Sequence, residues 1–397
     1  MNKKLLTVAI GAALGVVPML SAQADVKVGG HIQAEAYSAK AECNVGVNTA
    51  AATGIFAGSG VCAAANARSA KGTGLIDNAR GRFWIAVEED LGGGMKGLGH
   101  FEFSVDTANS GQAFTEGNSA SPYDTTGRTF DQRTREKFVG ISGGFGAVKL
   151  GNQHGVYKRM GGVNWDPLNA TVLEARGNGG QSGSADVNRG FAHNGFIAGA
   201  IKYESGKAFG NMVALEVLYA PHKNSNGAGD AGSGNDYQVG VSIKPIKDLE
   251  IIAAHSNNKK TPNIAANDDQ KANKVGARFT FLKDHTVFGQ YEKVDMNNSA
   301  TASVPTGAGI VGVPIDGKFL LVGYSAKFGN NSVILQAGQH EREVTGGDVE
   351  TDYLAIAFRH HFSKTMTATV GYRQSEAERL AVSNEVKVIA LGMRKNF

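Results

Sequence analysis

The chain has 397 residues, with 40 basic and 36 acidic side chains and a formal net charge of +4 at pH 7. This nearly balanced charge argues against nucleic acid as a partner. Glycine occurs at 54 positions and proline at 8, beside 10 tyrosines and 19 phenylalanines. The composition favours an all-β fold with many turns, because glycine costs a helix about 1 kcal/mol relative to alanine.

The first 24 residues have the features of a secretory signal peptide. Two lysines precede an apolar run that ends at Leu20, and residues 22–24 form an Ala-x-Ala cleavage site. We therefore expect a leader over 1–24 and a mature chain over 25–397 that lies outside the cytoplasm. Removing the two leader lysines leaves 38 basic against 36 acidic residues. After Leu20 no run approaches the ~18 apolar residues of a membrane helix, which excludes a helical membrane protein.

Cys43 and Cys62 are the only cysteines and share one stretch rich in glycine, alanine and asparagine. Because an exported chain permits a disulfide, we expect a local loop clip, with two free thiols as the alternative. No histidine or carboxylate is spaced around these cysteines as a ligand set, and the ten histidines are dispersed. The sequence therefore predicts no metal site and no cofactor.

A two-residue period recurs along the chain. From Tyr237 to Lys244 the odd positions are apolar and the even ones are polar or small, which predicts a strand with one apolar and one polar face. The same alternation returns over 274–281, 320–328, 365–373 and 389–393. These segments predict antiparallel strands.

The connections between strands sort into two classes. Seven short ones, rich in glycine, asparagine or proline, fall near 91–94, 143–146, 206–210, 245–248, 282–285, 329–331 and 363–365. Eight long polar ones cover 40–77, 106–131, 157–188, 221–236, 256–273, 296–317, 342–351 and 375–384. Fifteen connections imply sixteen strands. A soluble sandwich or propeller is the alternative, but short turns alternating with long loops are typical of an outer-membrane barrel.

Four runs resemble, in order, the hairpin motifs of Gram-negative general diffusion porins. They are Glu89 to Lys96 (EDLGGGMK), Phe138 to Gly146 (FVGISGGFG), Tyr203-Glu204-Ser205 and Gly392-Met393-Arg394. The chain ends on Phe397, which resembles the assembly signal of outer-membrane barrels. The resemblance spans 25–397. It implies a homotrimer, in outer-membrane lipid, of 16-stranded antiparallel transmembrane β-barrels. Each barrel would hold a water-filled channel narrowed by an inward-folded third loop, here 157–188.

Alternation within two strands predicts which side chains line that channel. On the second strand the apolar residues around Ile85 are expected to face lipid. The residues expected to face the lumen are Arg80 and Arg82 on the second strand and Arg135 and Lys137 on the fourth, where Phe138 and Gly140 are expected to face lipid.

The resemblance implies a constriction with cations on one wall and carboxylates on the loop. It assigns the basic wall to Arg82, Arg135 and Arg189, and the acidic loop residues to Asp166 and Glu174. Ordinary lumen polarity is the alternative for the arginines. Cations that face carboxylates leave a transverse field, which selects ions by sign and orders water and dipolar solutes.

We therefore expect an outer-membrane channel, without catalysis, for small hydrophilic solutes and ions. A porin specific for phosphate, oligosaccharides or organic acids is the main alternative, and an outer-membrane enzyme or a surface adhesin are others. Residues 140–144 (GISGG) fit the G-x-S-x-G nucleophile pattern. That pattern needs a helix after the turn, whereas an alternating strand follows here. The sign of ion selectivity stays open.

Overall fold

The computed structural model describes residues 24–47, 67–77, 81–105, 107–108, 130–131, 135–182, 195–206, 209, 211–221, 235–258, 270–295, 304–306, 310–312, 314–344, 348–379 and 382–397. Arg80, Arg189, Cys62 and the side chain of Cys43 lie outside the described residues. The roles expected for the two arginines and the disulfide therefore stay predictions.

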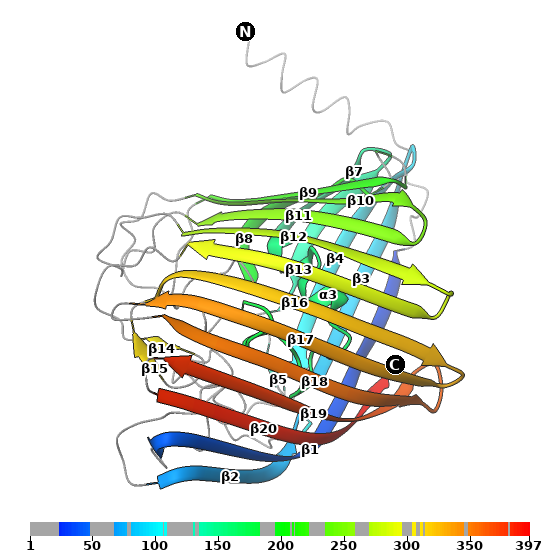
Figure 1. The fold of residues 1–397 in the computed structure, drawn as a ribbon. Coiled ribbons are helices and arrows are strands. Elements are labelled where there is room, and N and C mark those ends of the chain that lie inside the picture. The colour runs from blue at the N-terminus through cyan, green and yellow to red at the C-terminus, as the bar shows by residue number, and fades with distance from the viewer. Residues whose placement is uncertain are drawn as a thin grey trace.

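Within these residues, 18 strands form one antiparallel sheet that closes into a barrel (Figure 1). Its first nine strands are β1 (Asp25–Val47), β2 (Ala67–Ile76), β3 (Gly81–Gly92), β4 (Met95–Val105), β5 (Phe130–Asp131), β6 (Lys137–Gly143), β7 (Gly146–His154), β8 (Phe196–Glu204) and β9 (Val213–Ala220). The next nine are β10 (Asp236–Ile246), β11 (Leu249–Asn258), β12 (Gln270–Phe281), β13 (His285–Asp295), β16 (Pro314–Phe328), β17 (Asn331–Val344), β18 (Val349–His361), β19 (Met366–Arg379) and β20 (Val382–Asn396). The short strands β14 (Val304–Thr306) and β15 (Ile310–Gly312) pair separately.

The barrel has sixteen strands because two of them are interrupted. β2 and β3 both pair with β1, and β5 and β6 both pair with β4, so each pair forms one strand of the barrel wall. β1 also pairs with β20, which closes the sheet. At this seam the backbone of Phe397 exchanges two hydrogen bonds with Gly30. The predicted 16-stranded antiparallel barrel is confirmed, whereas the role of Phe397 in assembly stays a prediction.

The prediction of long connections over 342–351 and 375–384 is wrong. β17 and β18 leave only 345–348 between them, and β19 and β20 leave only 380–381. The ladders continue to the pairs Arg342 with Val349 and Arg379 with Val382. Strand ends that extend beyond the apolar band are polar on both faces, so their sequence has the composition of a loop while the backbone still pairs.

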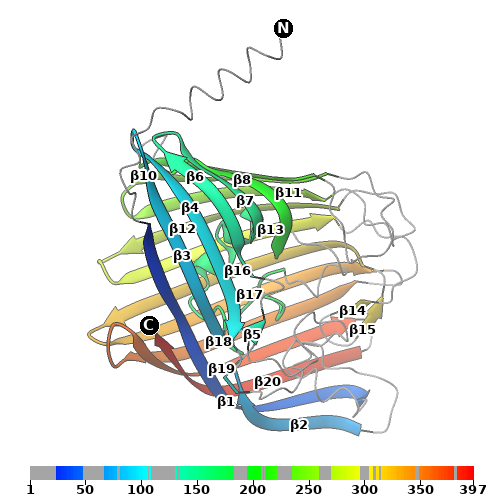
Figure 2. The same ribbon diagram turned by 180° about the vertical axis from the view of Figure 1, so that it is seen from behind.

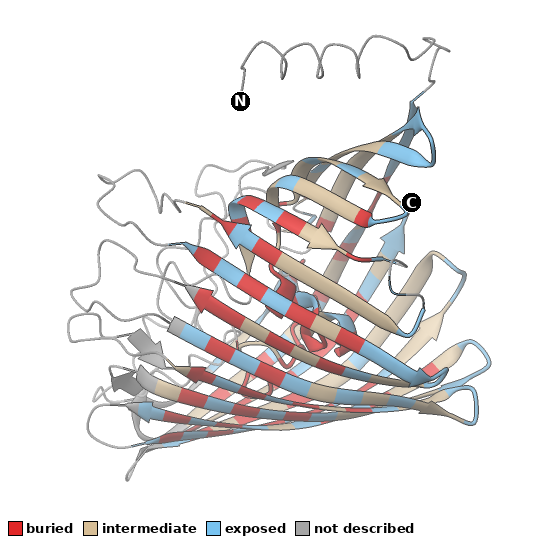
Figure 3. Ribbon diagram, turned by 90° about the horizontal axis from the view of Figure 1, so that it is seen from above, coloured by how far each residue is buried: buried red, intermediate tan, exposed pale blue. Residues whose placement is uncertain are grey.

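The apolar stripes face outward. Val275, Leu320 and Ile389 are 55%, 46% and 59% exposed, and exposed residues alternate with buried ones along the strands in Figure 3. Soluble proteins rarely expose so continuous an apolar surface. The outer surface is therefore the one that lipid covers, and the polar stripes face the lumen.

The parity expected for β6 is wrong. Phe138 pairs with His100 and stacks on its ring at 5.3 Å between centroids, whereas Lys137 pairs with Phe101, which is 47% exposed on the outer face. Lys137 therefore faces outward, and Phe138 faces inward. The alternation in the sequence predicted that the Phe138 ring faces lipid, but the ring packs inside the barrel.

Arg135 nevertheless reaches the inside, as expected. It precedes β6, where the chain between β5 and β6 interrupts the alternation, and its Nε donates a 2.5 Å hydrogen bond to Ser104 Oγ. On β3 the predicted parity holds: Arg82 pairs with Ser104 in the ladder. Both arginines of the predicted basic wall that lie within the described residues thus face the lumen.

We expect Val139→Arg to destabilise the barrel by about 2–4 kcal/mol, since it places a cation on the lipid face near mid-strand. Phe138→Arg should cost less, because that side chain faces water inside. Urea unfolding in lipid vesicles, followed by tryptophan fluorescence, measures both free energies. A larger loss of stability for Phe138→Arg than for Val139→Arg would mean that Phe138 faces lipid, as the sequence predicted.

Candidate functional site

The chain between β7 and β8 folds into the barrel. It includes two four-residue helices, α2 (Val156–Arg159) and α3 (Gly162–Trp165). In Figure 1 α3 lies behind β13 and β16, and Figure 2 shows β3, β4 and β6 on its other side. None of the helices in the described part of the chain is long and apolar enough to cross a membrane. The inward-folded third loop predicted from the sequence is confirmed over 155–182.

Glycines in the wall make room for this loop. A Cβ built on Gly240 of β10 would lie 2.6 Å from side-chain atoms of Met160 and Val156. One built on Gly338 of β17 would lie 2.5 Å from the Cα of Gly180 in the loop. Such distances are too short for carbon contacts, so these inward positions admit the loop only because they lack side chains.

The buried carboxylate of Glu292 binds two loop residues, Tyr157 and Ser182, that lie far apart along the loop. Glu292 Oε2 accepts hydrogen bonds from the Tyr157 hydroxyl at 3.0 Å and from Ser182 Oγ at 2.6 Å. Lys274 Nζ lies 3.9 Å from the same oxygen and donates to the Tyr157 carbonyl at 3.1 Å. Glu292 and Lys274 are both fully buried, so β12 and β13 hold the beginning of the loop close to Ser182, the last residue of its described part.

Asp166 organises the middle of the loop. Its Oδ1 accepts hydrogen bonds from the Leu168 N–H and from Gln336 Nε2 of β17, both at 2.8 Å, and its Oδ2 accepts the Ala175 N–H at 3.0 Å. Burial raises the pKa of Asp166 to about 6, although these hydrogen bonds favour the ionised form. The Tyr353 hydroxyl extends the network to Gln336 Oε1 at 2.9 Å.

Glu174 also takes part in the internal structure of the loop. Its Oε2 accepts the Ala170 N–H at 2.9 Å, and its Oε1 lies 3.5 Å from Arg176 Nη2. Glu174 and Asp166 are only 4% and 6% exposed. The hydrogen bonds described above join these acids to the loop and to β17. The arrangement expected from the resemblance, with these acids facing Arg82 and Arg135, stays a prediction.

Inward side chains of β1, β18 and β19 form hydrogen bonds with the loop, most of them with its backbone. Gln33 Nε2 of β1 donates to the Ala170 carbonyl at 2.6 Å, and Arg359 Nη2 of β18 donates to the Pro167 carbonyl at 2.8 Å. Three further contacts join Val172 N–H to Glu35 at 2.9 Å, Ser375 Oγ to the Asn178 carbonyl at 2.9 Å, and Arg373 to Asn178 Oδ1. Inward polar side chains thus replace the water that an exposed loop would bind.

Four further cations, which we call the basic wall, are Arg82, Arg135, Lys158 and Arg159. β4 stands eight places from β13 around the sixteen-stranded barrel, so Arg82 and Arg135, which flank β4, lie across the barrel from Glu292. Lys158 and Arg159 belong to α2, at the beginning of the loop. Arg82 Nε lies 3.2 Å from Glu102 Oε1, whereas Arg135 and Lys158 both lie over the Phe196 ring.

Lys158 and Arg159 were not among the residues expected at the constriction. The signal was present, since two cations follow Tyr157 directly after β7. Their positions depend on the turn of α2, which alternation in neighbouring strands does not reveal: Lys158 lies beside Arg135 over the Phe196 ring, and Arg159 lines the cavity described next.

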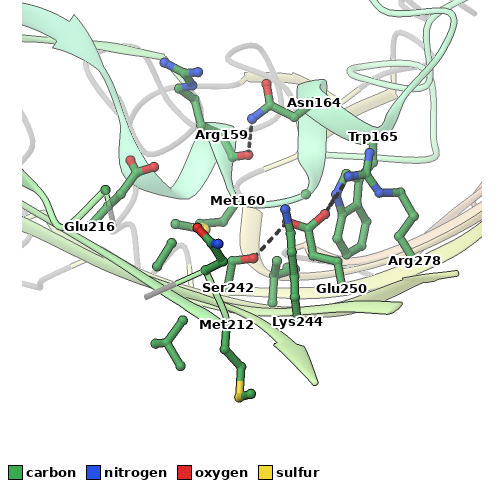
Figure 4. A pocket seen from close by; sticks show the side chains of 16 residues that line it. Arg159, Met160, Asn164, Trp165, Met212, Glu216, Ser242, Lys244, Glu250 and Arg278 are labelled. Carbon is green, nitrogen blue, oxygen red and sulfur yellow. Dashed lines mark hydrogen bonds and ion pairs between the residues drawn. The ribbon is translucent and has the colours of Figure 1, made fainter. Parts of the chain in front are cut away.

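A cavity of about 400 Å³ lies between the loop and β9 to β12 (Figure 4). Glu250 organises its floor by accepting hydrogen bonds from Trp165 Nε1 at 3.2 Å, Arg278 Nη2 at 2.6 Å and Ser242 Oγ at 2.8 Å. The Arg278 guanidinium lies 5.6 Å from the centre of the Trp165 ring. The cavity thus combines an aromatic ring, three cations and the carboxylates of Glu216 and Glu250.

We expect the stability difference between the wild type and Asp166→Asn to depend on pH. The Asp166 pKa of about 6 in the folded protein exceeds its ordinary value of 3.8, so the folded state binds the proton more tightly than the unfolded state does. Stability from this group therefore falls as pH rises from 3.8 to about 6, and levels off above that.

Thermal unfolding of both proteins across this window checks the expectation, as the wild-type Tm minus the variant Tm should fall with rising pH. Asp248→Asn, at the exposed β10–β11 turn, is the control for losing one carboxylate. A Tm difference that stays constant through the window would mean that Asp166 is not the buried acid described above.

Comparisons with known proteins agree with this architecture. The family model for Gram-negative porins matches residues 8–380. No curated protein matches the sequence.

Similar solved structures include the anion-selective porin from Comamonas acidovorans, with 17% identity over 94% of this chain and 100% of that one and a TM-score of 0.65. OmpF of Salmonella typhi, in complex with daunomycin, has 14% identity over 95% and 98% and a TM-score of 0.60. The outer membrane channel DcaP of Acinetobacter baumannii has 12% identity over 96% and 99% and a TM-score of 0.56. At these identities the structures share the fold. The family match covers most of the chain, and the chain therefore belongs to the Gram-negative porins, which form outer-membrane channels for diffusion.

Proposed function

We propose that this porin passes small hydrophilic solutes and ions without strict selection and that it prefers anions. The observation that carries the proposal is that hydrogen bonds within the loop and to β17 hold the buried acids Asp166 and Glu174, whereas Arg159 is exposed and Arg82 is partly exposed. When the residues that line the cavity are included, six cations (Arg82, Arg135, Lys158, Arg159, Lys244 and Arg278) stand against four carboxylates (Glu102, Glu136, Glu216 and Glu250). An excess of cations at a narrow point lowers the barrier for anions. The similar protein from Comamonas acidovorans is an anion-selective porin, which supports the same preference.

We also propose a homotrimer of exported chains. The resemblance to trimeric porins supports the assembly, and the similar OmpT of Vibrio cholerae has been solved in a trimer form. Cleavage after Ala24 would place the new N-terminus at the first residue of β1, Asp25. The mature protein would then consist of the barrel alone, over 25–397.

Catalysis is not part of the proposal. Ser142 lies near the end of β6, and β7 begins at Gly146, so a strand follows the turn where a nucleophile elbow requires a helix. Ester hydrolysis that disappears in Ser142→Ala would contradict this view.

A solute-selective porin is the second candidate, and the cavity beside Trp165 is the observation that favours it. Its cations, ring and carboxylate would suit a small zwitterion or organic acid. Saturable block of single-channel current by one solute would favour this candidate, whereas block that never saturates would favour general diffusion.

We expect planar bilayers with a KCl gradient to give a reversal potential of anion-selective sign. Arg82→Gln and Arg159→Gln should each lower the ratio of chloride to potassium permeability, by roughly two-fold, because each removes one cation from the lumen wall. Lys395→Gln is the matched control, since this exposed lysine near the C-terminus lies away from the loop. Cation selectivity in the wild type would overturn the proposed preference.

Native mass spectrometry of protein extracted from outer membranes should detect an assembly of three chains that each begin at Asp25. The chain mass reports cleavage and the assembly mass reports the trimer, so the two proposals are tested separately. A monomer that survives gentle extraction, or a chain that retains its leader, would contradict the corresponding one.

A further inference from the structure

Three potential metal ligands converge on the lumen wall beside Arg82. His100 and Glu102 are two residues apart on β4 and therefore share its inward face. Glu136 lies opposite Glu102, and its backbone carbonyl accepts the Glu102 N–H at 2.9 Å. One ligand atom from each side chain lies within 4.8 Å of the other two. A strand ladder therefore brings one imidazole and two carboxylates to a single point.

Other groups hold these ligands in place. The His100 ring is stacked between Phe138 at 5.3 Å and Trp84 at 6.1 Å. Glu136 Oε1 accepts the His154 N–H at 3.0 Å, which positions its carboxylate. Such supporting contacts orient metal ligands and strengthen binding.

One ring nitrogen of His100 lacks a hydrogen bond. His100 Nε2 is buried and has no hydrogen-bond partner in the part of the chain that the structure describes. A buried nitrogen without a partner is costly, and a cation that binds it would remove the cost. Arg82 is the nearby competitor, at 3.2 Å from Glu102 Oε1.

We propose that His100, Glu102 and Glu136 form a site for a divalent transition-metal ion, with Zn²⁺ as the representative. Three protein ligands of the nitrogen and oxygen type, with a fourth position open to water, suit zinc. Bonds of about 2.0–2.2 Å require the ligand atoms to move closer together by roughly 1 Å. The ion enters from the water-filled lumen, and once bound it adds two positive charges beside Arg82.

Isothermal titration of the folded, detergent-solubilised protein with ZnCl₂ tests the site. The wild type should bind one ion per chain, and Mg²⁺ at the same concentration should give no comparable heat. His100→Ala should weaken zinc binding by at least about ten-fold, since it removes the imidazole ligand. His255→Ala is the matched control because His255, on β11, is bonded to Asn273, and its zinc affinity should equal that of the wild type.

A second measurement needs no variant, which keeps the proposal testable if His100→Ala fails to fold. The electron paramagnetic resonance spectrum of Cu²⁺ bound to the wild type should show hyperfine coupling to a single imidazole nitrogen. Absence of saturable zinc binding, equal affinities in the wild type and folded His100→Ala, or a copper spectrum without nitrogen coupling would each overturn the proposal. Neither readout depends on solute passage, so the proposed channel function stands or fails separately.

Discussion

Burying a loop inside a barrel depends on giving its backbone hydrogen-bond partners other than water. An unpaired buried N–H or C=O group costs about as much as a lost hydrogen bond. Here the partners are inward side chains that belong to strands far apart in the sequence, among them Gln33 of β1, Gln336 of β17 and Arg359 of β18. The loop can cross the channel because the wall supplies these groups where the loop passes.

The same constraint explains what the acidic residues do. Asp166, Glu174 and Glu292 each accept hydrogen bonds that fold or anchor the loop. A carboxylate used in this way is buried and contributes less to the field in the lumen than an exposed one would. Arg135 and Lys158 are buried as well, but Arg159 is exposed and Arg82 is partly exposed, so the balance of charge along the passage leans to the positive side.

Space is the second requirement for docking the loop. Gly240 and Gly338 face inward where Met160 and Gly180 approach, and larger residues would push the loop away from the wall. The polar contacts and the missing side chains act together: the glycines set how close the loop comes, and the hydrogen bonds set its register along the wall.

The sequence alone determined the number of barrel strands, the outward face of most of them and the inward third loop. Alternation and turn residues are local, so strands such as β10 and β12 could be predicted from their own residues. Three further features depended on the tertiary structure: the inward orientation of Phe138, the length of the four strands β17, β18, β19 and β20, and the burial of Asp166. The tertiary structure also placed Lys158 beside Arg135, with both cations over the Phe196 ring. Each of these depends on a partner distant in sequence, such as His100 for Phe138 or Gln336 for Asp166, and a local pattern carries no information about which distant residue will lie opposite.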